Sequence, residues 1–214
     1  MIIERVVSLA VPEGEVVKIT CEGKTLWQKR KYKREITYLE STGTQYIDTG
    51  IKLTNNHSTE LDYQITTVPK TNERRGLYGG LEANVARFGS LVSPTTRCLE
   101  YGYGIGNVYY QTDIPDTKRH TIKQEKNRVY VDGTLIYTFA NVSFSMHTTA
   151  PLGTFRYTNY MPMLAKYYSF KMWNGVALVR DFIPVLDWEN TPCMYDKVSG
   201  ELFYNKGTGE FLYG

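Results

Sequence analysis

Two tyrosine-rich stretches carry the side chains best suited to bind a ligand. The first spans residues 101–111 and supplies Tyr101, Tyr103, Asn107, Tyr109 and Gln111. The second spans residues 155–160 and supplies Arg156, Tyr157 and Asn159. Aromatic faces stack on the CH groups of sugar rings, and amide and guanidinium groups hydrogen-bond to sugar hydroxyls. We take these eight residues as candidate ligand-binding residues, and packing within a sheet is the alternative for any single tyrosine.

One strand-like segment places acidic residues at the alternate spacing used by retaining glycosidases. Such enzymes need two carboxylates about 5–5.5 Å apart, and a strand presents every second side chain on one face. Glu60 and Asp62 have this spacing, but Gln64 occupies the next position, and its amide cannot protonate a leaving group. We interpret this segment as the polar face of a strand and expect that the protein is not an enzyme.

The sequence contains no pattern typical of a metal or cofactor site. Its three cysteines and three histidines are scattered along the chain, without a Cys-x-x-Cys pair. No P-loop or dinucleotide-binding glycine motif occurs. The odd number of distant cysteines also argues against a disulfide framework. We therefore expect no bound metal and no cofactor.

Length and composition indicate a folded chain with one main domain. The 214 residues include 42% hydrophobic and 22% charged residues, which is ordinary for a globular protein. No apolar run approaches the ~20 residues of a membrane-spanning helix. Glu4 and Arg5 stand where a signal peptide would have its apolar core. We expect neither membrane insertion nor a secretion signal.

Positive charge is concentrated between residues 24 and 35. This segment holds six lysines and arginines against one glutamate, whereas the net charge of the whole chain is +3. A basic run can contact nucleic acid, but a solvated linker is the more common role. Because the rest of the chain has no basic excess, we expect a linker and no nucleic-acid partner.

Alternating apolar and polar residues predict strands along most of the chain. Residues 7–27 indicate a small β-meander, and short strands separated by glycine-containing turns follow from residue 36. Asp132-Gly133 predicts a hairpin, because both residue types tolerate the positive φ angles of a type I′ turn. Many short strands without helical periodicity predict an all-β sandwich, and a jelly roll fits about 180 residues best. We expect Trp173 and Trp188 in its core.

Three segments resemble the concanavalin A-like (laminin G-like) jelly-roll superfamily of lectins and glucanases. They are residues 38–50 (YLESTGTQYIDTG), the hairpin at 129–135, and the tail between 165 and 205. The first and last are similar to domains of phage and prophage structural proteins of gut Firmicutes. The resemblance implies a jelly-roll domain over residues 36–214. We expect a small β attachment or oligomerisation segment at 1–28 and a basic linker at 29–35 before it.

This resemblance implies a non-catalytic virion protein, such as a tail or head fibre component, that binds host-surface carbohydrate. We expect the N-terminal segment to attach to other virion proteins, with Trp27 as its docking residue. A meander this small is not stable alone, so we also expect a homo-oligomer, for example a trimer. The expected location is the virion, with the bacterial cell surface as the alternative. Two other functions stay open: a purely structural capsid-decoration or fibre domain without glycan binding, and a glycoside hydrolase.

Overall fold

The computed structural model describes residues 7–214 apart from 11–15, 22–23, 29 and 114, and it describes side chains from residue 30 onward. The secondary structure of the described residues consists of strands, which form three antiparallel sheets. None of the described segments is a helix that is long and apolar enough to cross a membrane.

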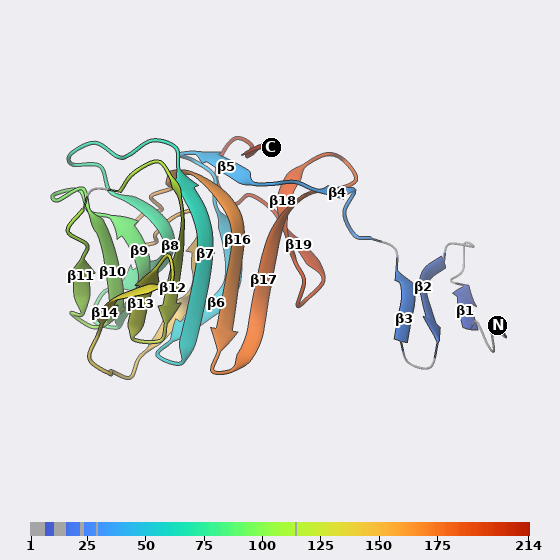
Figure 1. The fold of residues 1–214 in the computed structure, drawn as a ribbon, viewed down its shortest axis with the longest axis horizontal. Coiled ribbons are helices and arrows are strands. Elements are labelled where there is room, and N and C mark those ends of the chain that lie inside the picture. Colours follow the sequence, from blue (N-terminus) through green and yellow to red (C-terminus); the bar gives the residue numbers. More distant parts are fainter. Residues whose placement is uncertain (1–6, 11–15, 22–23, 29, 114) are drawn as a thin grey trace.

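The N-terminal strands form a sheet of their own (Figure 1). Its strands, in spatial order, are β1 (Val7–Ala10), β2 (Val16–Cys21) and β3 (Lys24–Gln28). Within the described residues, these strands pair only with one another, which confirms the predicted meander. Trp27 lies opposite Ile19 in this sheet, but its side chain is outside the described part of the structure. The division of the chain into domains stays a prediction.

The first layer of the sandwich is a six-stranded sheet with the order β11-β10-β9-β8-β15-β6. Two of its pairs, β8–β15 and β15–β6, join strands far apart in the chain, and such long connections are typical of a jelly roll. Its strands are β6 (Ile47–Thr54), β8 (Arg75–Glu82), β9 (Ala86–Val92), β10 (Leu99–Gly104), β11 (Val108–Tyr110) and β15 (Ser145–Leu152).

The second layer follows the order β14-β13-β12-β7-β16-β17-β18-β19, and three short strands join it at the side. Of these, β4 pairs with β17, β5 with β16, and β20 with β5. The strands are β4 (Arg34–Glu35), β5 (Leu39–Thr42), β7 (His57–Ile65), β12 (Arg119–Glu125), β13 (Arg128–Val131), β14 (Thr134–Thr138), β16 (Leu164–Asn174), β17 (Ala177–Leu186), β18 (Pro192–Asp196), β19 (Glu201–Phe203) and β20 (Leu212–Tyr213).

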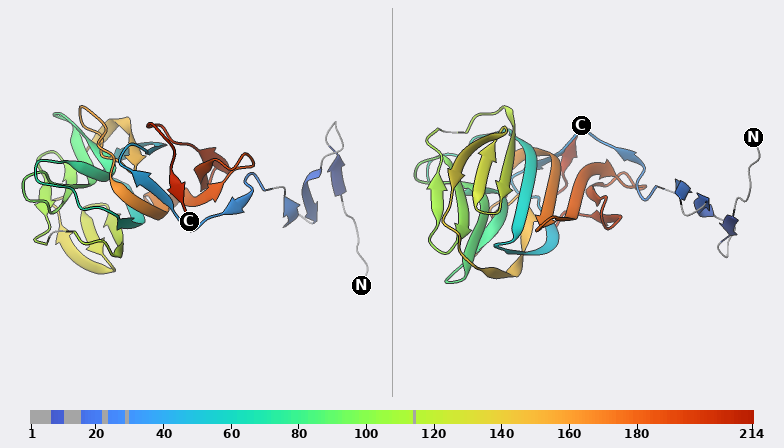
Figure 2. Two further views of the ribbon diagram at one scale, coloured as in Figure 1. Left: turned by 90° about the horizontal axis from the view of Figure 1, so that it is seen from above. Right: turned by 60° about the horizontal axis from the view of Figure 1, so that its bottom comes forward.

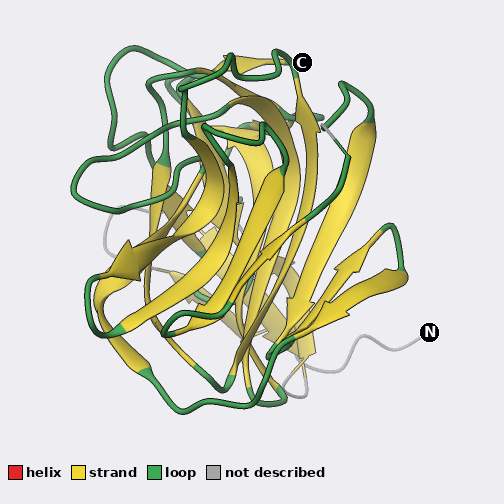
Figure 3. Cartoon of the chain, turned by 90° about the vertical axis from the view of Figure 1, so that its left-hand side faces the viewer, coloured by secondary structure: helices red, strands yellow, loops and turns green. Residues whose placement is uncertain are grey.

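The hydrophobic core lies between these two layers (Figures 2 and 3). Leu61, Tyr63 and Ile65 are buried in β7, while the residues between them are partly exposed. This alternation follows from the pleat of a strand whose two faces meet the core and solvent. The β10 residues Tyr101 and Tyr103 also belong to the core. The fold is the predicted all-β, jelly-roll type of sandwich.

The predicted β13–β14 hairpin is present. Asp132 and Gly133 have φ angles of 49° and 77°, which are the positive values that a type I′ turn requires. The β16–β17 turn likewise contains Gly175 with a φ angle of 60°. These two turns cap opposite ends of the second layer, because β13 and β16 run in opposite directions through it.

Residues 30–35 of the basic segment are held against the sandwich. β4 pairs with the end of β17, and Tyr32 is buried beside Val185 and Cys193. The Lys33 Nζ donates to Asn190 Oδ1 at 2.6 Å, although the lysine itself is exposed. Backbone pairing therefore fixes the path of this segment while its charged side chains remain in solvent.

Trp188 departs from expectation. Its side chain is 57% exposed, and its indole Nε1 donates to the Arg30 carbonyl oxygen at 3.3 Å. The reason is its position in the β17–β18 turn, where Asp187 caps the backbone amides of Glu189 and Thr191. An indole in this turn covers the incoming basic segment and does not enter the core.

Candidate functional site

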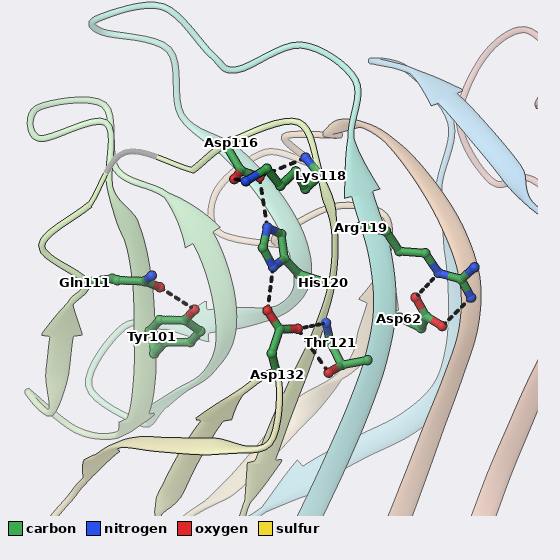
Figure 4. Close-up of polar contacts among 9 residues, drawn as sticks. All are labelled: Asp62, Tyr101, Gln111, Asp116, Lys118, Arg119, His120, Thr121 and Asp132. Atoms are coloured by element: carbon green, nitrogen blue, oxygen red, sulfur yellow. Dashed lines mark hydrogen bonds and ion pairs between the residues drawn. The ribbon is translucent and has the colours of Figure 1, made fainter.

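The structure places the rings of Tyr101 and Tyr103 in the core, where they are not exposed for stacking on a sugar. Their exposed fractions are 0% and 1%. The Tyr101 hydroxyl bonds to Gln111 Oε1 at 3.0 Å (Figure 4), and burial of the phenol raises the Tyr101 pKa. Tyr101 and Tyr103 are two residues apart in β10, so their rings lie on the same face of the strand, and that face meets the core.

Tyr109 and Gln111 lie at the edge where the two layers meet. The Tyr109 ring stacks on that of Tyr137 from β14, with a centroid distance of 4.3 Å and an interplanar angle of 11°. This stack connects the edge strands of both sheets. The Asn107 carbonyl accepts the Tyr103 amide at 3.1 Å and closes the β10–β11 turn. The first tyrosine-rich stretch is therefore mainly structural, and it does not present its candidate residues on one surface.

The second stretch forms a surface loop that is fixed to β8. The Arg156 amide donates to the Gly79 carbonyl at 3.0 Å, and the Arg156 carbonyl accepts the Leu81 amide at 2.7 Å. Tyr157 is 43% exposed, and Asn159 is also exposed. Arg156 and Tyr157 line a small open pocket of about 290 Å³ next to Glu82. The candidate residues of the second stretch therefore have side chains that a ligand can reach.

The acidic face of β7 is engaged in contacts within the sheet. Asp62 accepts two hydrogen bonds from Arg119, at 2.8 Å from Nε and 2.7 Å from Nη2 (Figure 4). Gln64 accepts a hydrogen bond from the Tyr168 hydroxyl at 2.9 Å. Glu60 lies between Lys123 and Lys171 in the ladder. The segment is thus a polar strand face of alternating charges.

A cleft of about 760 Å³ lies at one end of the sandwich. It lies between four turns and loops that are distant in the sequence, including the β6–β7 and β16–β17 turns at the lower edge of Figure 1. We call it the end cleft. Its lining residues are Asn55, Asn56, Ser58, Tyr103, Glu125, Lys126, Asn127, Arg128, Asn141, Val142, Ser143, Gly175 and Val176.

Hydrogen bonds between the turns give the end cleft a fixed shape. Asn56 Nδ2 donates to Asn174 Oδ1 at 2.8 Å, and the Asn56 carbonyl accepts the Gly175 amide at 3.0 Å. The Tyr103 hydroxyl donates to the Asn55 carbonyl at 3.0 Å. Because the turns are tied together in this way, the polar groups on them are already in place before a ligand binds.

The lining of the end cleft is predominantly amide, hydroxyl and charged. Four asparagines and two serines line it, together with Glu125, Lys126 and Arg128. An asparagine amide offers two N–H donors and a carbonyl acceptor, so it can satisfy a hydroxyl as either donor or acceptor. The arrangement can therefore hold a ligand rich in hydroxyl groups.

Sequence reasoning missed this cleft except for Tyr103. The available signal was a set of asparagines next to turn-forming residues or to one another, such as Asn55-Asn56 and Asn174-Gly175. Turn residues are usually explained by backbone conformation alone, so their convergence at one end becomes visible only in the fold. Within the described residues, no group of His, Cys, Asp and Glu side chains has the arrangement of a metal site.

No protein-family model and no curated protein sequence matches the chain. Among solved structures, the chain is similar to a candidate carbohydrate-binding protein from Bacteroides ovatus, with a TM-score of 0.57 and 14% identity. That match covers 85% of this chain and 60% of the other. A sialidase from Trypanosoma rangeli matches with a TM-score of 0.43 and 18% identity, over 56% of this chain and 21% of that one.

This chain therefore spans about 60% of the length of the Bacteroides protein. At 14% identity, that likeness concerns the fold alone and leaves the ligand to be argued from the side chains. The architecture that the two proteins share is the β-sandwich.

Proposed function

We propose that the chain is a non-catalytic carbohydrate-binding protein whose ligand occupies the end cleft. The observation that carries this proposal is a cleft of about 760 Å³. Four asparagines and two serines from turns that are distant in the sequence come together in its lining. Amide and hydroxyl groups on a rigid scaffold complement the hydroxyl groups of a sugar. The similarity in fold to a candidate carbohydrate-binding protein agrees with this proposal.

The chemistry of the lining favours a sugar over an apolar ligand. Pockets for apolar small molecules are lined mostly by hydrophobic and aromatic side chains with few polar groups. In the end cleft the proportions are reversed, with Val142 and Val176 as the aliphatic members. A small oligosaccharide has both the size and the hydrogen-bonding capacity to fill it.

The contacts on β7 support binding without catalysis. Glycoside hydrolysis needs a carboxylic acid and a second carboxylate across the scissile bond. Asp62 instead holds Arg119 through both carboxylate oxygens, and the third position of the acidic pattern is Gln64. Glu125 is the single carboxylate in the end cleft lining.

The virion assignment belongs to the same proposal. The N-terminal sheet has β1 and β3 as its edge strands, and unpaired edge strands recruit strands of other chains. We propose that this sheet attaches the sandwich to other virion proteins or to further copies of the chain, leaving the end cleft free for host-surface glycans. The alternative is attachment at a bacterial cell surface.

The test is glycan binding by the full chain. It should bind members of a glycan panel and whole bacterial cells saturably, without release of reducing sugar. The double variant Asn141→Ala/Ser143→Ala removes two exposed polar groups of the cleft and should weaken binding about tenfold or more, because each lost hydrogen bond contributes about 1 kcal/mol.

The matched comparison is Asn159→Ala in the second stretch. Binding that is lost in Asn159→Ala but retained in the double variant would move the site to the 155–160 loop. Absence of binding to every glycan and cell type would leave the purely structural role, and release of reducing sugar would support a hydrolase. Near-UV circular dichroism of each variant would confirm that the sandwich is folded.

A further inference from the structure

The end cleft carries more positive than negative charge. Lys126 and Arg128 line it from the β12–β13 hairpin, and Glu125 is the one acidic residue among its lining side chains. Neither Lys126 nor Arg128 forms an ion pair with another described residue. Two cations therefore face one carboxylate at the same end of the sandwich.

The Glu125 carboxylate is already occupied by groups outside the lining. Its Oε1 lies 3.3 Å from Lys123 Nζ, and its Oε2 accepts a hydrogen bond from the Tyr130 hydroxyl at 3.4 Å. Because Lys123 offsets this negative charge, Glu125 does little to neutralise Lys126 and Arg128. The cleft keeps a local excess of positive charge.

The two cations are borne on a hairpin that is fixed in place. Lys126 has a φ angle of 51°, and its amide donates to Ser58 Oγ at 3.2 Å. Asn127 Nδ2 donates to the Phe139 carbonyl at 2.7 Å, and the Phe139 amide donates back to the Asn127 carbonyl at 2.7 Å. Arg128 then begins the paired part of β13, opposite Thr138. These bonds hold the backbone of the hairpin at the rim of the cleft.

From this arrangement we infer that the end cleft selects glycans that carry an anionic group, a carboxylate or a sulfate, over neutral glycans. The inference rests on the proposed function and names its ligand class. The guanidinium of Arg128 offers paired N–H donors to two oxygens of one anionic group. Lys126 adds a second positive charge, and the asparagines bind the sugar hydroxyls.

The experiment uses tetrasaccharides, and each backbone is prepared in three forms: neutral, with a 6-carboxylate, and with a 6-sulfate. The backbones are those that bind in the glycan panel, supplemented by galactose and glucose tetrasaccharides. Isothermal titration of the full chain would be run at about 50 mM and about 300 mM NaCl, because added salt shortens the range of electrostatic attraction. Free acetate and free sulfate would show whether the anion alone suffices.

We expect the charged forms to bind about tenfold or more tightly than the neutral form at low salt, and the ratio to shrink at high salt. Arg128→Gln and Lys126→Gln should each lower the affinity for the charged forms several-fold more than the affinity for the neutral form. Lys197→Gln, in the exposed β18–β19 turn, is the matched loss of one charge and should change neither.

Equal affinities for neutral and charged forms would overturn the inference and leave the proposed function standing. An equal effect of Lys197→Gln and Arg128→Gln would also overturn it, because the attraction would then come from net charge and not from the cleft. If no form of any backbone binds, the proposed function itself fails. Preference for the carboxylate or for the sulfate would identify the anionic group, and either preference supports the inference.

Discussion

Nδ1 of His120 lies 2.6 Å from Oδ2 of Asp132, and this contact joins the start of β12 to the β13–β14 turn (Figure 4). On its other side, the ring reaches Asp116 Oδ1 through Nε2 at 2.8 Å. One imidazole thus connects a hairpin turn and the loop before β12. Both contacts are strongest when the ring carries a positive charge, so the stability of this end of the sandwich should depend on pH.

The first prediction concerns that dependence. Burial lowers the pKa of His120, but hydrogen bonds to Asp132 and Asp116 more than compensate and raise it above its ordinary value. A raised folded-state pKa means that the stabilisation is complete below about pH 6.5 and is lost as pH rises through the folded pKa. Asp132 has a lowered pKa, so the stability that its carboxylate contributes to the fold is lost as pH falls through that lowered pKa. The contacts should stabilise the protein most between these two pKa values.

Urea unfolding of His120→Gln and the unmodified protein at several pH values tests this prediction. Because the cluster is partly open to solvent, we expect the variant to be less stable by at most about 1 kcal/mol near pH 6, and by less near pH 8.5. A stability difference that is the same at both pH values would show that the ring acts by packing and not by its charge.

The second prediction concerns the Tyr109–Tyr137 stack between the two edge strands. Tyr137→Ala should lower the free energy of unfolding by about 1–2 kcal/mol, since it removes an aromatic pair and part of its buried area. Tyr110→Ala, at a more exposed position on the same edge, should stay within about 0.5 kcal/mol of the unmodified protein. Denaturant titration measures both. Similar losses in the two variants would contradict a specific role for the stack.

The fold was predictable because its signals are local. Alternation in segments such as Leu61, Tyr63 and Ile65 marks a strand with one buried face, and Asp132-Gly133 marks a hairpin, without reference to distant residues. The superfamily within the β-sandwiches was a matter of resemblance and stays a prediction. Trp188 was misplaced because the backbone pairing of the basic segment, which it covers, has no such local signal.

The candidate site was less predictable because it depends on which strand faces meet. Tyr101 and Tyr103 alternate with glycines, which indicates one shared face but not whether that face meets the core or solvent. The end cleft combines turns that lie more than a hundred residues apart, such as those holding Asn56 and Gly175. Only the pairing of β7 with β16 brings these turns together.

The third prediction concerns close approach of the backbone in the six-stranded sheet. Gly89 has a φ angle of 120°, and a Cβ atom at this position would overlap the Tyr78 carbonyl oxygen of β8. Gly89→Ala should therefore destabilise the protein by more than about 2 kcal/mol or prevent folding. Gly106→Ala is the control, because its φ angle is also positive, at 69°, but a Cβ there meets no described atom within 4 Å.

Gly106→Ala should cost only about 1 kcal/mol, from conformational strain alone. Thermal unfolding followed by far-UV circular dichroism measures both variants. Equal stability of the two variants would mean that β8 and β9 can separate locally to admit a methyl group. Glycine at position 89 would then be needed only for its positive φ angle.

The fourth prediction concerns the buried ion pair between Arg87 of β9 and Glu100 of β10. The Arg87 residue is 9% exposed and Glu100 is 3% exposed, on the outer face of the six-stranded sheet. Burial lowers the pKa of Arg87, while the charge of Glu100 acts in the opposite direction. The guanidinium also lies over the Phe155 ring, 5.3 Å from its centroid, so the loop before Arg156 seals the pair from water.

Arg87→Met leaves Glu100 buried without its partner and should destabilise the protein by about 3–5 kcal/mol at neutral pH. Arg87→Met/Glu100→Met removes both charges, and we expect it to be within about 1–2 kcal/mol of the unmodified protein, because an apolar pair replaces a desolvated ionic one. A double-mutant cycle from urea titrations gives the coupling energy. If the two single variants simply add, the charges are solvated enough to act independently, and the seal formed by Phe155 does not exclude water from them.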